Sequence, residues 1–115
     1  MQITIDLPDS LVRKIITGIM ENFPEANQTL RCIGWQYAKL KFRFSDDEDG
    51  KCYNLTEQEL TKAFALIFTD KWPKGCAKVP VSNDPEVWDD WLCQCDAVDF
   101  DAFVQLAIFS EVIYG

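Results

Sequence analysis

Residues 35–44 carry the pattern that most limits how this chain can fold. From Ala38 to Phe44 an apolar side chain stands at every second position, and lysine or arginine stands between them. Side chains at a period of two point alternately to the two faces of a β-strand. We therefore expect residues 35–44 to form one strand, with Leu40 and Phe42 on its buried face.

A polar turn follows this predicted strand. Residues 45–51 contain four consecutive acids and the pair Asp49-Gly50, which tolerates a positive φ. Residues 52–55 are then expected to return as a short antiparallel partner. Residues 2–7 also alternate between polar and apolar side chains, which predicts a further strand.

The remaining segments repeat their apolar residues at helical spacing. Thr56 and Glu59 have the spacing of a capping box, and Asp84 with Pro85 is typical of a helix start. Phe68 and Val87 are among the apolar side chains expected to point inward. The predicted helices cover residues 10–23, 56–68, 84–92 and 99–114.

These elements predict an α+β fold, in which about four helices pack on a small antiparallel sheet of about three strands. The chain has 115 residues, close to the commonest length of one domain. At that length folding buries roughly 65% of the surface of the unfolded chain, enough for one core. We expect residues 1–115 to form a single compact domain.

The sequence predicts a cytoplasmic protein without membrane contact. No apolar run approaches the roughly 18 residues that a membrane-spanning helix needs. The first residues lack the basic region and the unbroken apolar stretch of a secretory signal. Five cysteines, an odd number, are expected to stay as thiols in a reducing compartment.

Charge is distributed unevenly along the chain, whose net charge is −8. Residues 1–44 hold six Lys or Arg and four Asp or Glu, a net +2, whereas residues 45–115 hold five Lys and fifteen acids, a net −10. After Lys78 there are eight acids and no base. Such a domain repels nucleic acid and anionic membranes and is attracted to a basic protein surface.

Catalytic machinery is not recognisable in this sequence. There is no histidine, which removes serine–histidine and cysteine–histidine mechanisms and the commonest nitrogen ligand of metals. None of the five glycines belongs to a phosphate-binding pattern, which argues against nucleotide binding. We expect a protein that is not an enzyme and that needs no cofactor.

The acidic turn invites comparison with a calcium-binding loop. Counted from Ser45, Asp47 and Asp49 stand at ligand positions and Gly50 at the glycine position. However, the first position is a serine, the position of the bidentate glutamate is Thr56, and a strand precedes the loop. A solvated hairpin turn is favoured over an occupied metal site.

Cys93 and Cys95 are separated by one residue, whereas zinc and thiol redox motifs usually have two residues between their cysteines. Cys52 and Cys76 would complete four thiolates, but nothing in the spacing requires it. Structural thiols are favoured over a zinc site, and redox work remains a further alternative.

Two more groups have both a structural and a functional interpretation. Trp88 and Trp91 share a helix face, and core tryptophans are favoured over an aromatic hot spot ringed by acids. Asp96, Asp99 and Asp101 are favoured as residues that cap a helix over a paired general acid and base.

The segment Tyr53-Asn54-Leu55-Thr56, together with the ending at residues 99–105 and 109–115, resembles a loose group of small uncharacterised proteins encoded by phages and mobile elements. The likeness covers about half of the chain and carries over no catalytic residue. It implies a setting in which small acidic proteins are often inhibitors of host or defence factors.

The leading hypothesis is a small acidic interaction module that docks on a basic protein surface, of the kind that holds nucleic acid. The alternatives are a metal-dependent carboxylate enzyme and a homo-oligomeric structural subunit whose aromatic helices form a self-interface. The acids expected to bind the partner are Asp46, Asp47, Glu48, Asp49, Glu86, Asp89, Asp90, Asp96, Asp99 and Asp101.

Overall fold

The computed structural model describes residues 6–25 and 29–114. Within them the predicted α+β class is confirmed, with three antiparallel strands in the order β1-β2-β3 and four α-helices. The strand predicted over residues 2–7 lies outside the described residues, except for its last two positions. The elements are α1 (Asp9–Glu21), β1 (Leu30–Gln36), the 3₁₀ turn η1 (Tyr37–Lys39), β2 (Lys41–Asp46), β3 (Cys52–Leu55), α2 (Glu57–Leu66), α3 (Pro85–Gln94) and α4 (Ala97–Phe109).

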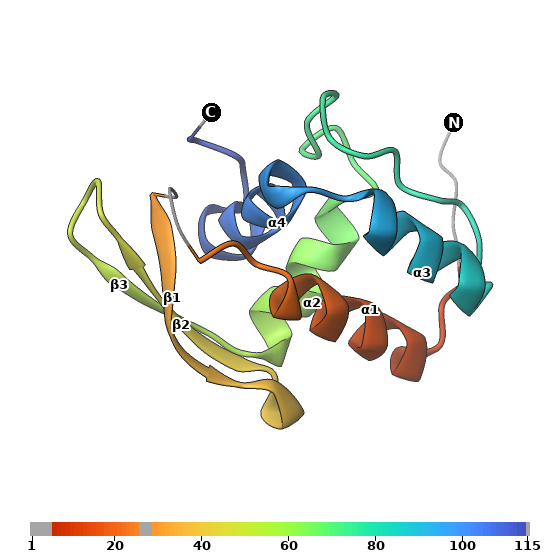
Figure 1. Cartoon of the computed structure of the whole chain (residues 1–115), viewed down its shortest axis with the longest axis horizontal. Helices are drawn as coiled ribbons and strands as arrows, with labels where there is room; N and C mark the ends of the chain where they lie inside the picture. The colour runs from red at the N-terminus through yellow and green to blue at the C-terminus, as the bar shows by residue number, and fades with distance from the viewer. Residues whose placement is uncertain (1–5, 26–28, 115) are drawn as a thin grey trace.

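All four helices lie to one side of the sheet (Figure 1). β2 is the central strand and sends Phe42 and Phe44 into the core, while Lys41 and Arg43 between them stay exposed. The alternation that predicted a strand thus describes β2 well. Since one face of the sheet meets the helices and the other carries charged side chains, only the first face belongs to the core.

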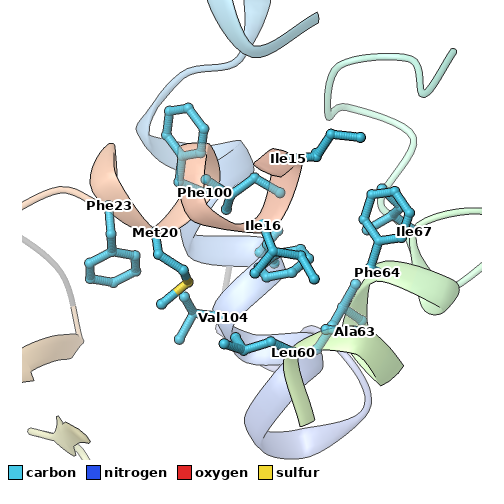
Figure 2. Packing of buried hydrophobic residues seen from close by; sticks show 14 of the residues in the cluster. Ile15, Ile16, Met20, Phe23, Leu60, Ala63, Phe64, Ile67, Phe100 and Val104 are labelled. Atoms are coloured by element: carbon cyan, nitrogen blue, oxygen red, sulfur yellow. The ribbon is translucent and has the colours of Figure 1, made fainter. Parts of the chain in front are cut away.

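The core is built where α1, α2 and α4 meet (Figure 2). Ile15 and Ile16 of α1 lie on the side of Phe64 of α2, and Val104 of α4 lies next to Met20 of α1. These positions follow from apolar residues that recur three or four apart, so that each helix buries one stripe. α1 also lies against α3, where a Cβ added to Gly18 would stand 2.8 Å from Leu92 Cδ1.

The prediction of one strand over residues 35–44 is wrong. β1 ends at Gln36, η1 reverses the chain, and Leu40 adopts the left-handed conformation with φ 49° before β2 begins. The two strands then pair antiparallel, with Trp35 opposite Phe42. Leu40 is fully buried, so the turn folds inward and places an apolar side chain where most turns carry a glycine or asparagine.

β1 contains an irregularity that the sequence pattern did not reveal. Cys32 pairs with Phe44 and Gly34 with Arg43, so Ile33 is an extra residue with no opposite partner. This is the geometry of a β-bulge, which bends its strand and increases the local twist.

Several helix details differ from expectation. The Thr56 hydroxyl bonds the Glu59 carboxylate itself, and the threonine side chain caps no backbone amide. This hydrogen bond lowers the pKa of Glu59. Phe68 and Val87, expected inside, are exposed. α4 ends at Phe109 rather than at residue 114, because Ser110 turns left-handed at φ 62°.

Candidate docking surface

The acidic turn between β2 and β3 is organised around Asp46. Its carboxylate is buried and accepts the backbone N–H groups of Glu48, at 2.8 Å, and Asp49, at 3.2 Å. It also accepts a hydrogen bond of 2.8 Å from the Tyr114 hydroxyl. Since these donors occupy it and solvent does not reach it, Asp46 builds the turn and cannot contact a partner in this conformation.

The other acids of this turn are exposed. Asp47 pairs with Arg31 at 3.0 Å, whereas Asp49 accepts the Tyr53 hydroxyl at 2.7 Å and the Lys51 amide at 2.8 Å. The hydrogen bond from Tyr53 lowers the pKa of Asp49. Only Glu48 leaves its carboxylate without a partner in the part of the chain that is described.

The predicted hairpin is confirmed, since β2 and β3 pair antiparallel and Gly50 has φ 72°. Over residues 6–25 and 29–114, no three acidic or cysteine side chains gather in an arrangement that could hold a metal ion.

Asp96 and Asp99 cap α4, as predicted. They form a capping box, in which Asp96 Oδ1 accepts the Val98 and Asp99 amides, and Asp99 Oδ2 accepts the Asp96 amide at 2.9 Å. Asp99 is 5% exposed, and its other oxygen accepts the Ala77 amide at 3.0 Å. Both oxygens of the Asp99 carboxylate are therefore used in hydrogen bonds within the protein, whereas the side chain of Asp96 remains exposed.

Asp101 has a different environment from its two neighbours. Its carboxylate accepts a hydrogen bond of 2.6 Å from Gln105 Nε2, one turn further along α4. Burial raises the pKa of this carboxyl group. Asp101 therefore holds Gln105 in place rather than capping the helix.

Trp88 and Trp91 belong to the core, as predicted, and their rings meet edge to face at 5.3 Å. The Trp88 indole N–H donates to the Ser82 carbonyl at 2.8 Å, which satisfies its only polar group. These two side chains fix the inner side of α3 and hence the direction in which its outer side faces.

The outer side of α3 is an acidic stripe, formed by Glu86, Asp89 and Asp90. Positions three and four apart share one face of a helix, and all three side chains are exposed. Within the described residues the stripe takes part in one ion pair, a long one from Lys14 Nζ to Asp89 Oδ2 at 3.9 Å. Neither α3 nor α4 contains a basic residue, so most of the stripe's negative charge is not neutralised locally.

The acids predicted to bind a partner do not form one surface. The β2–β3 turn and α3 lie at opposite ends of the molecule's long axis, which is horizontal in Figure 1. Asp46 and Asp99 are buried, and Asp101 is half-buried. The exposed acids thus fall into separate groups, and the acidic stripe of α3 is the group whose three carboxylates share one helix face.

All five cysteines are free thiols, as expected. Cys93 is exposed at the end of α3, whereas Cys76 and Cys95 are half-buried. Burial, and then the nearby Asp99 carboxylate, raises the pKa of Cys76 and of Cys95 to about 12. Both therefore stay protonated at neutral pH, which makes them poor nucleophiles.

Sequence reasoning missed the residues that hold the C-terminal segment. Gln105 is buried among apolar neighbours, and its Oε1 accepts the Ile113 and Tyr114 amides, each at 2.8 Å. The signal was a single glutamine inside the apolar run 102–109, since a buried amide side chain needs partners.

Comparison of the chain with known protein families, with curated proteins and with solved structures gives no match. Among the described helices, none is long and apolar enough to cross a membrane.

Proposed function

We propose that this protein is a small acidic interaction module, and that the acidic stripe of α3 docks on a basic surface of a partner protein. The observation that carries the proposal is the exposure of Glu86, Asp89 and Asp90 on one face of one helix, where the described part of the chain supplies one cation, Lys14, at 3.9 Å from the Asp89 carboxylate. An unneutralised row of like charges attracts an oppositely charged surface over a distance of about one Debye length, roughly 8–10 Å in physiological salt.

The rigidity of α3 supports this role. Trp88 and Trp91 are buried on the inner side, and the Asp84 carboxylate caps the first turn by accepting the Glu86 amide at 2.9 Å. The three carboxylates are therefore held on a helix that need not be ordered when it binds, which lowers the entropy lost on association.

We propose further that the partner's basic surface is of the kind that holds nucleic acid. A row of carboxylates on a helix presents negative charge to such a surface, as a phosphate backbone does. By occupying it, the protein would act as an inhibitor or an accessory factor of that partner. The alternative of a self-interface through the aromatic helices loses its main support, because both tryptophans of α3 are buried.

The test is a pull-down from a host lysate at low and at high salt, with retained proteins identified by mass spectrometry. The variant E86K/D89K/D90K reverses the stripe and changes the net charge from −8 to −2, since each of three changes adds two units. We expect it to lose a nucleic-acid-binding partner that the wild-type protein retains at low salt and releases at high salt.

The matched control is E25K/E48K/E111K, which has the same net charge of −2 but alters three exposed acids outside α3. It should keep the partner. If both triple variants lose the same proteins to the same degree, overall charge rather than the stripe controls retention and the proposal fails.

A further inference from the structure

The connection between α2 and α3 is unusually long, and hydrogen bonds fix it to the rest of the protein. It covers residues 67–84 without a helix or strand, whereas most connections in compact domains have about 4–6 residues and long ones are commonly functional. The Trp72 indole donates to the Ala77 carbonyl at 2.9 Å, and the Ala77 amide donates to buried Asp99 at 3.0 Å. The Trp88 indole N–H donates a hydrogen bond to the Ser82 carbonyl. The loop is thus tied to the core at several points.

This loop lines a groove of about 510 Å³, a volume within the usual range of ligand sites. The loop runs along the top of the view in Figure 1, between α2 and α3. Two of the apolar side chains that line the groove are notably accessible, Phe68 at 39% and Val81 at 62%. Trp72, which is 9% exposed, forms part of the same wall.

The charge of the groove is opposite to that of the molecule. Lys74 and Lys78 line it, and no acidic residue does. Together with Lys71 they are the only basic residues after Lys62, so residues 67–84 have three lysines and two aspartates, a net +1 in a chain of −8. Within the described residues none of these three lysines forms an ion pair.

We propose that this groove binds a short acidic peptide segment of a partner protein. An apolar side chain of the peptide lies against Phe68 and Val81, and its carboxylates face Lys74 and Lys78. An apolar centre with a charged rim is the usual composition of a protein interface. A nucleic acid strand fits less well, because it would carry a dense run of phosphates beyond the groove and against the acidic remainder of the surface, whereas a short peptide can place its few carboxylates at the lysines.

This site does not depend on the acidic stripe of α3, and it takes a partner of the opposite charge. A protein with both surfaces joins a basic protein to an acidic one. Its role then goes beyond the docking proposed above and becomes bridging, and each surface can be tested while the other is left intact.

The experiment is the selection of binders from a random dodecapeptide library, displayed on phage, against the immobilised full chain. We expect enrichment of peptides that combine several Asp or Glu with one large apolar residue. Calorimetry with the synthetic peptides should show that K74E/K78E weakens binding by about tenfold or more. V81S tests the apolar contact without touching the core and should weaken binding about threefold.

The matched control is K51E/K62E, which changes the net charge equally but alters lysines outside the groove. It should weaken binding by less than K74E/K78E, and E86K/D89K/D90K should not weaken it. The proposal is overturned if selection yields no binder, if the enriched peptides are neutral or basic, or if K74E/K78E binds as tightly as the wild-type protein. It is also overturned if oligodeoxythymidylate binds the groove lysines more tightly than every selected peptide.

Discussion

The Tyr114 hydroxyl donates a hydrogen bond of 2.8 Å to the carboxylate of Asp46, 68 positions earlier in the chain. This contact joins the segment after α4 to the β2–β3 turn. The Phe109 ring contacts both Tyr53 of β3, at a ring distance of 5.6 Å, and Tyr114, at 5.9 Å. The last described residues therefore support the sheet and are part of the fold.

Alkaline pH should weaken this connection. Hydrogen bonds to Asp46 and Asp49 raise the pKa of Tyr114 and of Tyr53, respectively, from 10.0 to about 12. Between pH 10 and 12 the folded protein keeps protons that the unfolded chain releases, so the free energy of unfolding falls as pH rises. Urea denaturation across this range should show the fall.

The variants Y114F and Y53F each remove one of the two tyrosine hydroxyl groups whose pKa is raised. We expect both to have a lower melting temperature than the wild-type protein at neutral pH and a flatter dependence on pH between 10 and 12. A variant that lost stability as steeply as the wild-type protein would contradict the assignment of the alkaline transition to these tyrosines.

The amide of Gln105 should be essential for holding the C-terminal segment. It donates to Asp101 and to the Tyr114 carbonyl, and it accepts two backbone amides. Q105M keeps the volume but removes these hydrogen bonds, so we expect the free energy of unfolding to fall by about 2–4 kcal/mol. Hydrogen exchange should then accelerate at Ile113 and Tyr114 while the amides of α1 stay protected. Unchanged exchange there would show that the aromatic contacts suffice.

Asp99 should matter more to stability than Asp96, although both cap α4. D96A removes an exposed cap and should lower the free energy of unfolding by about 1 kcal/mol. D99A also releases the Ala77 amide from a buried carboxylate, so we expect a loss of about 2–4 kcal/mol. D99N, which keeps one acceptor oxygen, should fall between them. Chemical denaturation measures all three, and equal losses in D96A and D99A would contradict the second role of Asp99.

The cysteines should differ in their reactivity toward iodoacetamide near neutral pH. Cys52 and Cys93 are exposed and should be alkylated first. Cys76 and Cys95 should react slowly, since a pKa of about 12 leaves little thiolate. Tandem mass spectrometry locates the label, and denatured protein gives the reference rates. Labelling of Cys95 as fast as Cys93 in the folded protein would contradict the raised pKa.

Local signals predicted most of the helices correctly, because the residues that start a helix act on their own backbone. Asp84 with Pro85 and Asp96 with Asp99 are examples. The turn at Leu40 could not be predicted in this way. It contains no glycine, asparagine or proline, and its conformation is stabilised by the burial of the leucine in a core that forms only from distant segments.

The candidate site was predictable in composition but not in arrangement. The acids after Lys78 were evident from the sequence, yet only the fold separates exposed Asp89 from buried Asp99. The groove formed by the 67–84 loop had no local signal, because all of its lining residues come from a segment without periodicity. Sequence periodicity reports the faces of helices and strands, whereas the shape of an irregular loop leaves no such pattern.

The bulge at Ile33 has a consequence for how the protein behaves at high concentration. Among the described strands β1 lies at an edge of the sheet, and it exposes Ile33 and Trp35. A regular edge of this composition would be a template for strands of other molecules and thus a starting point for fibrils. Because the extra residue breaks the hydrogen-bond spacing of β1, an incoming strand finds no continuous ladder to extend.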